Sequence, residues 1–317
     1  QPFWHRITGC DRLHGHCYGS QTSITDRDRN AFMTLQTNDY ILTLSCPDRM
    51  GIVHRVSGLL LAHEGNIIDA QQFGDEQTGR FFLRVHFVLK DKQIDSVKAD
   101  MVTVAQAFDM QWQIHGAQDK PRILILVSKQ GHCLNDLLFR VHSGQLNAQI
   151  AGVVSNHRDF EGLVQSHGVA FHHLPVTPES KADQEQQILE LVDRLNVDLV
   201  VLARYMQILS TELCQALAGR AINIHHSFLP SFKGAKPYYQ AHERGVKIIG
   251  ATAHYVTPDL DEGPIIEQDI ERVDHAMSVR DLTRVGSDVE SLVLARAVKA
   301  HTEHRILLNG SRTVVFR

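Results

Sequence analysis

Polar side chains gather at the end of an apolar segment in the second half of the chain. The run 221–224 is apolar apart from Asn223, and His225, His226 and Ser227 follow it directly. This pattern predicts a strand whose end presents an amide, two imidazoles and a hydroxyl. Three interpretations are open: a metal site, a catalytic edge, or a row of polar residues with structural partners.

Strand alternation favours the pair Asn223 and His225. Side chains alternate between the two faces of a strand, so these two share a face and His226 points to the other. This separation removes a chelating pair of histidines, and an amide is a poor zinc ligand, so we expect no metal. Two neighbouring N–H groups can instead donate to one oxygen, as acyl transfer requires where negative charge develops.

A second polar stretch offers groups that could activate a nucleophile. The segment "GATAHYVTPDLDEGPII" (250–266) contains His254, Asp259, Asp261 and Glu262 between two apolar runs. A carboxylate in this loop can serve as a base if the loop reaches the end of the first strand. Acidic loops are more often solvated turns, and the residues alone do not select one acid.

Hydrophobic periodicity divides the chain into two domains. Residues 37–116 read as strand, helix, two strands, helix and strand, the βαββαβ order of a ferredoxin-like domain. A linker, 117–121, leads into 122–317, where apolar strands alternate with amphipathic helices. This predicts an α/β domain with a doubly wound, mostly parallel sheet. Ligands of such sheets bind at the carboxyl ends of the strands, where Asn223 and His225 fall.

Composition excludes several classes of protein. The 317 residues are 43% hydrophobic and 21% charged, and the formal charge of −4 argues against a nucleic-acid partner. No apolar run reaches the roughly 18–20 residues that cross a bilayer, so we expect no membrane contact. The five cysteines form no CxxC pair, which favours the reducing cytoplasm. We expect residues 1–36 to be a disordered tail, a leader or an added extension.

The segment "CPDRMGIVHRVSGLLLAHEGNIID" (46–69) resembles the ACT domain. The resemblance implies a regulatory module that binds amino acids at subunit interfaces, hence a homo-oligomer, with methionine and glycine as candidate effectors of opposite sign. The free N–H groups at the start of the first helix could receive a ligand carboxylate. Alternatively the loop only caps the helix and the domain drives assembly, and Asn66 is a turn residue. The implied ligand residues are Asp48, Arg49, Met50, Gly51 and, near the same loop, Asn66.

Three motifs, "INIHHSFLP", "GATAHYV" and "DLDEGPI", are similar to the formyltransferase family of folate enzymes. The resemblance extends over nearly all of residues 122–317. It implies a catalytic trio of Asn223, His225 and Asp261, and at Gln207 the chain departs from relatives that tend to carry arginine. The implied supporting residues are His254, His226 and Ser227. The implied folate-binding residues are Leu202, Met206, Gln207, Ile208, Leu209 and Asp259.

Members of this family differ in the acceptor of the formyl group. The loop 128–136, "SKQGHCLND", has one glycine and lacks the flexible run that would wrap a phosphate. An ACT-like module before the catalytic domain is similar to the branch in which water is the acceptor. This implies hydrolysis of 10-formyltetrahydrofolate to formate and tetrahydrofolate, with water activated by Asp261 and no metal or other cofactor. Alternatives are transfer to an amine and a non-catalytic folate or amino-acid sensor. A nucleotide-binding oxidoreductase has little weight, because no GxGxxG follows the first strand of the sheet.

Overall fold

The computed structural model describes residues 38–90, 94–229 and 237–317. The expectation for residues 1–36 lies outside these ranges. Within them, the chain builds a four-stranded sheet, a seven-stranded sheet and a two-stranded hairpin. None of the helices in the described ranges is long and apolar enough to span a membrane.

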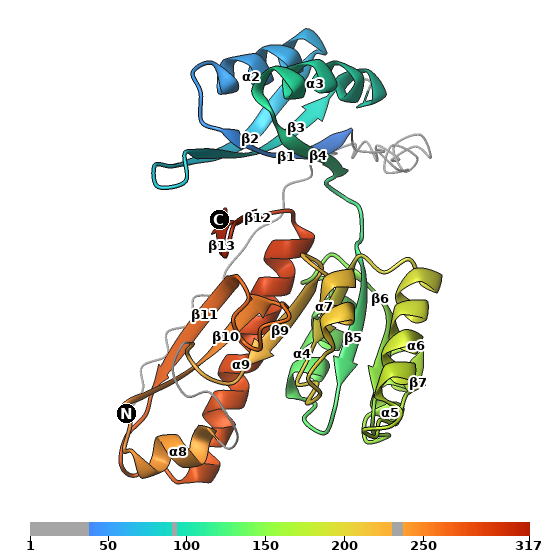
Figure 1. Ribbon diagram of the computed structural model, residues 1–317, viewed down its shortest axis with the longest axis vertical. Helices are drawn as coiled ribbons and strands as arrows, with labels where there is room; N and C mark the ends of the chain where they lie inside the picture. Colours follow the sequence, from blue (N-terminus) through green and yellow to red (C-terminus); the bar gives the residue numbers. More distant parts are fainter. Residues whose placement is uncertain (1–37, 91–93, 230–236) are drawn as a thin grey trace, which may run out of the picture. The chain divides into compact units, whose positions relative to one another are not determined.

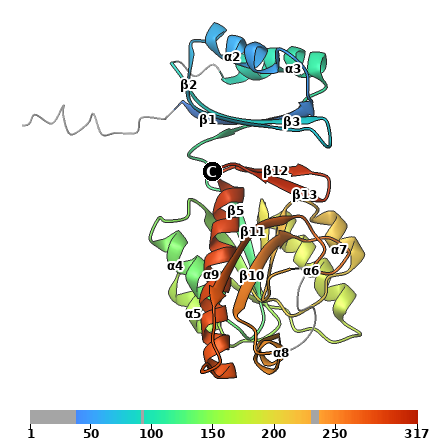
Figure 2. The same ribbon diagram turned by 90° about the vertical axis from the view of Figure 1, so that its left-hand side faces the viewer.

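The N-terminal sheet is antiparallel throughout, with strand order β2-β3-β1-β4. Two helices cover one of its faces (Figure 2). This is the predicted βαββαβ arrangement, and the prediction is confirmed. Its elements are β1 (Asp39–Pro47), α2 (Ile52–Ala62), β2 (Gly65–Asp75), β3 (Arg80–Leu89), α3 (Ile94–Phe108) and β4 (Gln111–Gly116).

Helical spacing explains how α2 packs on this sheet. Ile52, Val56 and Leu60 recur every four residues and are all buried, which places one apolar stripe against the strands. They share a core with Leu42 and Phe87 of the sheet. The apolar periodicity of this segment therefore folds as predicted.

The second sheet has the order β11-β10-β9-β8-β5-β6-β7. Strands β5 to β9 run parallel, and β10 pairs antiparallel with both β9 and β11. The predicted mostly parallel sheet is confirmed. Its elements are β5 (Arg122–Val127), α4 (His132–His142), β6 (Gln149–Ser155), α5 (Glu161–Ser166), β7 (Phe171–His173), α6 (Lys181–Arg194), β8 (Leu199–Leu202), α7 (Thr211–Ala216), β9 (Ala221–His225), α8 (Pro237–Glu243), β10 (Ile248–Tyr255), β11 (Ile265–Arg272) and α9 (Val279–Thr302), followed by the hairpin β12 (Ile306–Asn309) and β13 (Arg312–Val315).

Both faces of this sheet are covered by helices (Figure 1). Ile123 and Ile125 of β5 belong to one core with residues of α4 and α9, whereas Leu124 and Leu126 belong to another with α6 and α7. Because side chains alternate along a strand, an unbroken apolar strand is needed to fill both cores. A doubly wound sheet is the result.

The strand order reverses between β5 and β8. From β5 the sheet grows toward β6 and β7, and β8 and β9 then add on the other side. The loops that follow β5 and β8 therefore diverge and leave a crevice at the carboxyl edge of the sheet. Two hydrogen bonds join these loops: Ser128 N donates to the Arg204 carbonyl at 3.2 Å, and Met206 N donates to the Ser128 hydroxyl at 3.0 Å.

Candidate active site

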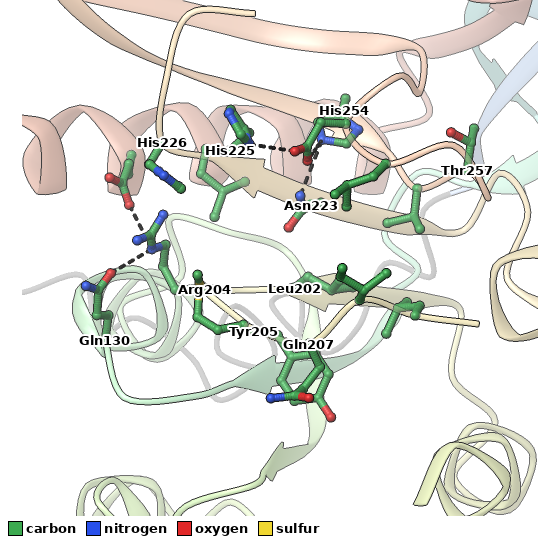
Figure 3. A pocket seen from close by; sticks show the side chains of 18 of the residues that line it. Gln130, Leu202, Arg204, Tyr205, Gln207, Asn223, His225, His226, His254 and Thr257 are labelled. Atoms are coloured by element: carbon green, nitrogen blue, oxygen red, sulfur yellow. Dashed lines mark hydrogen bonds and ion pairs between the residues drawn. The ribbon is translucent and has the colours of Figure 1, made fainter. Parts of the chain in front are cut away.

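A cavity of about 610 Å³ lies at this carboxyl edge. Figure 3 shows side chains from β9, from the loop after β8 and from the segment after β10 turned toward one another across it. Asn223, His225 and Asp261 all line the cavity, as does His254. Groups from three segments that are separated in the sequence are thus brought to one place.

His225 and Asp261 form a buried pair. The His225 Nδ1 lies 3.2 Å from the Asp261 Oδ2, so the ring N–H donates to the carboxylate. Burial opposes ionisation of this carboxyl, but the hydrogen bond from His225 holds the pKa of Asp261 well below its usual range. Asp261 is therefore a carboxylate at neutral pH.

The second ring nitrogen of His225 is unsatisfied within the described part of the chain. Its Nε2 is buried and has no hydrogen-bond partner among the described residues. Because Nδ1 is committed to Asp261, protonation of the ring places an N–H at Nε2 with no competing acceptor. Such a donor suits an oxygen on which negative charge develops.

His254 fixes the amide of Asn223. The His254 Nδ1 is 2.9 Å from the Tyr255 carbonyl, which can only accept, so Nδ1 carries the proton. The Nε2 then accepts from the Asn223 Nδ2 at 3.3 Å. The amide is thereby oriented with its nitrogen toward His254, and it keeps a second N–H for another acceptor. This arrangement agrees with the supporting role expected for His254.

The backbone around Asp261 is strained. Asp261 has φ of 57°, in the left-handed region that L-residues rarely adopt. Strain of this kind persists where surrounding contacts hold a residue in place, often at functional sites. Two residues later, a Cβ built on Gly263 would lie 1.7 Å from the Tyr255 carbonyl oxygen. The loop that carries Asp261 therefore approaches β10 as closely as a glycine permits.

Replacement of Gly263 by alanine should displace this loop. The added methyl group overlaps a backbone oxygen that cannot rotate away, so we expect a loss of about 1–3 kcal/mol in the free energy of unfolding. The activity that the family resemblance implies should fall as well, because Asp261 moves with the loop. Urea unfolding measures the first effect, and release of formate, the product that the resemblance implies, measures the second. Gly162→Ala is a comparison at an open position in α5 without a left-handed backbone, where turnover should be kept.

The expected separation of His225 from His226 is wrong. The two rings are stacked, with centroids 4.9 Å apart and planes inclined by 23°, and both line the cavity. The reason is that β9 ends at His225, so alternation no longer applies to the next residue. Burial, then Arg204 and His225, lower the pKa of His226 to about 4, so His226 is neutral at pH 7. Ser227 is buried and not part of the cavity wall.

The predicted folate-binding residues fall mainly on the cavity wall. Met206 and Ile208 are 58% and 63% exposed, which a packing role would not produce. Asp259 is exposed and absent from the wall, and its folate-binding role stays a prediction. The predicted residues that line the cavity are Leu202, Met206, Gln207, Ile208 and Leu209.

The predicted regulatory residues do not all meet within one chain. Gly51 is the N-cap of α2 with φ of 90°, and no side chain caps this helix, while Met50 is 98% exposed. Asn66 pairs with Val88 near one end of β3, whereas Pro47, just before the loop 48–51, pairs with Arg80 at the other end. The expectation that Asn66 lies near the loop is thus wrong within a single chain. It is also a strand residue and not a turn residue, since β2 begins at Gly65.

Further cavity residues carry no expectation from the sequence: Gln130, Tyr238 and Glu290. Glu290 could have been recognised in the sequence as an acidic residue on an apolar helix face. It lies beside Val289 on the buried side of α9, one turn before Leu294, and an acid on an apolar stripe needs a partner. Arg204 directly follows the apolar run of β8, where a ligand site begins in such sheets.

One group of metal-ligand type occurs in the described part of the chain: His132, Cys133 and Glu290. Burial, followed by the Glu290 charge, raises the pKa of the Cys133 thiol far above its usual value, so it stays protonated and ligates poorly. The Arg204 Nε lies 3.4 Å from Glu290 and already supplies a positive charge. These donors do not fit a cation.

Fold and site together define a formyl transferase domain with an ACT domain before it. Residues 121–298 match the Formyl transferase family, and residues 40–100 match the ACT domain family. The match places the Asn–His–Asp cluster within the formyl transferase region.

Similarity to known proteins narrows this class. The chain is 51% identical over 280 residues to "Formyltetrahydrofolate deformylase" of Corynebacterium sp. (strain P-1), covering 88% of this chain and 98% of that one. It is similar to the crystal structure of formyltetrahydrofolate deformylase from Burkholderia mallei ATCC 23344, with a TM-score of 0.86 and 54% sequence identity. This match covers 88% of this chain and 100% of that one. The chain belongs to the formyltetrahydrofolate deformylase family. The structure of glycinamide ribonucleotide transformylase 1 from Symbiobacterium toebii matches less of this chain, with a TM-score of 0.59 and 32% sequence identity. That match covers 62% of this chain and 95% of the other.

Proposed function

We propose that this chain hydrolyses 10-formyltetrahydrofolate to formate and tetrahydrofolate, with Asn223, His225 and Asp261 as its catalytic residues. The observation that carries the proposal is the Asn–His–Asp cluster at the cavity wall, in a chain of the deformylase family. Asp261 is ionised, His225 presents an unpartnered nitrogen, and Asn223 has a spare N–H. An acyl-transfer site needs a proton acceptor and donors for the developing oxyanion.

The reaction proceeds by attack of water on the formyl carbon. The water oxygen forms a bond to this carbon, and the carbonyl oxygen becomes negative between the Asn223 N–H and the Nε2–H of protonated His225. Asp261 accepts the proton of the attacking water. The C–N10 bond then breaks, the proton passes to N10, and formate and tetrahydrofolate leave.

The folate is bound by the apolar part of the cavity. Leu202 is buried at the end of β8, and Ile208 and Leu209 follow it in the loop. Flat apolar walls of this kind suit a ring system such as pterin. Gln207 offers an amide and no charge, so the carboxylates of the folate tail lack a cation at this position. The proposal needs no metal, because ionised Asp261 and the two donors already supply the base and the oxyanion contacts.

Formate release without an amine acceptor tests the proposal. The purified chain should release formate steadily from 10-formyltetrahydrofolate in buffer alone, in amounts far above one equivalent. A transferase would release formate only by side reaction and would turn over when an amine is added. A folate or amino-acid sensor would bind the compound and release none. Either of these results overturns the proposed hydrolysis.

We further propose that amino acids regulate the reaction through the loop 48–51. The first N–H groups of α2 have no side-chain cap and can bind a carboxylate. From the same domain, the Arg84 guanidinium donates to the carbonyls of Glu303 and His304 at 3.1 Å each, directly after α9. Since α9 also carries Glu290 of the cavity, binding at the loop has a structural route to the site.

Methionine and glycine should change turnover in opposite directions. We expect changes of about 5- to 150-fold in kcat or KM at saturating effector, the range that coupling free energies usually give. Arg49→Ala should remove the response, because the side chain lies in the ligand loop. A response that persists undiminished in this variant would contradict binding at the loop.

We also propose that the chain forms a homo-oligomer in the cytoplasm. Strand β2 is an edge of its sheet and carries Ile68 and Phe73, which are 55% and 46% exposed. Apolar edge strands are ready to pair with another chain. Cys46, Cys133 and Cys214 are free and buried, as is usual in a reducing compartment. Sedimentation of the purified protein tests the assembly.

A further inference from the structure

The cavity has two chemically different ends. Figure 3 shows Gln130, Arg204 and His226 at one end, with Leu202 and Thr257 farther along, and Asn223 and His225 between. The labelled groups of the first end are all charged or polar; of the two farther along, Leu202 is apolar and Thr257 is polar. With the folate beside Leu202, a second reactant would approach the formyl carbon from the first end, which we call the polar end.

An arginine fills this polar end. Arg204 is only 7% exposed, although it lines the cavity. Its Nε donates to the Gln130 Oε1 at 2.8 Å and lies 3.4 Å from the Glu290 Oε2. A buried guanidinium needs such partners, because it cannot lose its charge in a protein.

The carboxylate that pairs with this arginine is itself held firmly. The Glu290 Oε2 lies 2.8 Å from the His132 Nε2, and the Tyr238 hydroxyl donates to the Glu290 Oε1 at 2.6 Å. Burial opposes its ionisation, but His132 and Arg204 hold the pKa of Glu290 below its usual value. Glu290 is 1% exposed, so its charge is available to Arg204 and not to solvent.

The backbone at Arg204 is unusual for a residue of this type. Its φ is 63°, in the left-handed region where glycine is the favoured residue. The carbonyl of the same residue accepts from Ser128 N at 3.2 Å, which fixes the chain in this conformation. A long, charged side chain is thus kept at a position where the backbone alone would select glycine, which points to a function of the side chain.

We propose that Arg204, held by Glu290 and Gln130, occupies the acceptor subsite and makes water the nucleophile of this site. The proposal rests on the proposed hydrolysis. An amine acceptor reaches the site as an ammonium ion, which the Arg204 charge repels and the guanidinium volume excludes. Glu290, which would otherwise attract the ammonium, is already neutralised by Arg204. Water is small and uncharged and still reaches the formyl carbon beside His225.

Removal of Arg204 converts the same end into a site for a cation. Glu290 and Gln130 then face an open volume, and a primary amine can bind there and pass a proton to Glu290 or Asp261. The amine nitrogen forms a bond to the formyl carbon and gives up a second proton, which N10 takes as the C–N10 bond breaks. The products are a formamide and tetrahydrofolate, with no formate.

The partition of the formyl group between water and an amine tests the proposal. Wild-type chain and Arg204→Gly are incubated with 10-formyltetrahydrofolate and either glycinamide, which is largely a cation at pH 7, or hydroxylamine, which is neutral. Formate and the formylated amine are both quantified, after subtraction of a reaction without enzyme. We expect Arg204→Gly to raise the ratio of formylglycinamide to formate by at least about tenfold. The ratio of formylated hydroxylamine to formate should rise less in this variant, because charge repulsion does not exclude neutral hydroxylamine from the wild-type site.

The ratio of the two products does not depend on the fraction of folded enzyme, since both come from active molecules. Glycine also fits the φ of 63° at this position, so the change introduces no backbone strain. If the single variant folds poorly, the double variant Arg204→Gly with Glu290→Gln also removes the buried carboxylate that has lost its arginine. The double variant should formylate hydroxylamine but should not favour glycinamide. Arg204→Lys and the exposed Asp288→Asn, on the same helix as Glu290, should keep the wild-type ratio.

The possible outcomes separate the two proposals. Wild-type chain that releases no formate contradicts the proposed hydrolysis. Wild-type chain that releases formate, with an unchanged glycinamide ratio in Arg204→Gly and an unchanged hydroxylamine ratio in the double variant, overturns the acceptor role of Arg204 and leaves the hydrolysis intact. A ratio that rises equally for Asp288→Asn also overturns it.

Discussion

Asp261→Asn should lower kcat for formate release by about 100- to 10,000-fold, the usual contribution of positioned proton transfer. The amide cannot accept the proton of water, and it removes the negative charge that now lies 3.2 Å from the His225 Nδ1. Folate binding should be kept, because the apolar wall does not include this residue. Asparagine also tolerates the left-handed backbone found at this position, with φ of 57°, so the loop keeps its course.

The measurement is a steady-state assay of formate, together with a fluorescence titration of folate binding. Asp259→Asn is the matched control: it removes a carboxylate from the same loop at an exposed position outside the cavity wall. Its kcat should stay within about twofold of wild type, as is usual for surface changes. A rise in its KM would support the predicted contact of Asp259 with folate. Normal kcat in Asp261→Asn would exclude Asp261 as the base.

Asn223→Ala should lower kcat by about 100- to 1,000-fold, the cost of one oxyanion donor. KM should change little, since the amide donates mainly to the oxygen of the transition state. The change also frees the His254 Nε2 that now accepts from the Asn223 amide at 3.3 Å. That effect is confined to one hydrogen bond, because His254 keeps its bond to the Tyr255 carbonyl.

Gln207→Ala separates catalysis from binding in this comparison. It removes an amide from the cavity wall away from the trio, so it should raise KM and leave kcat nearly unchanged. If Asn223→Ala raises KM with normal kcat, Asn223 is a binding residue and the oxyanion role is wrong. If both variants lower kcat equally, the effect comes from general loss of cavity shape.

The sheets and their helices were predictable because burial leaves a direct mark on the sequence. Leu124 and Ile125 of β5 fill opposite cores, which explains why such strands are apolar throughout. The site was partly predictable for the same reason. Strand alternation put Asn223 and His225 on one face, and the fold places the end of their strand at the carboxyl edge. The choice of Asp261 came from the family resemblance, because a loop acid has no periodicity.

Other features depend on where elements end, which sequence patterns locate poorly. His226 stacks on His225 because β9 stops one residue earlier, and alternation fails at such a stop. The pair of Arg204 and Glu290 joins a loop to a helix across 86 residues of sequence, a contact that only the fold reveals. Asn66 lies far from the loop 48–51 because α2 carries the chain to the opposite end of the sheet.

Isotope labelling of the formate tests the central claim most directly. The wild-type chain is incubated with 10-formyltetrahydrofolate in water enriched in oxygen-18, with no amine present, and the formate is analysed by mass spectrometry. Attack by water predicts steady turnover, with one oxygen of each formate from the solvent and the other from the formyl group. Authentic formate in the same buffer corrects for exchange. Formate without solvent oxygen, or no formate beyond a single equivalent, would contradict hydrolysis at the Asn223, His225 and Asp261 site.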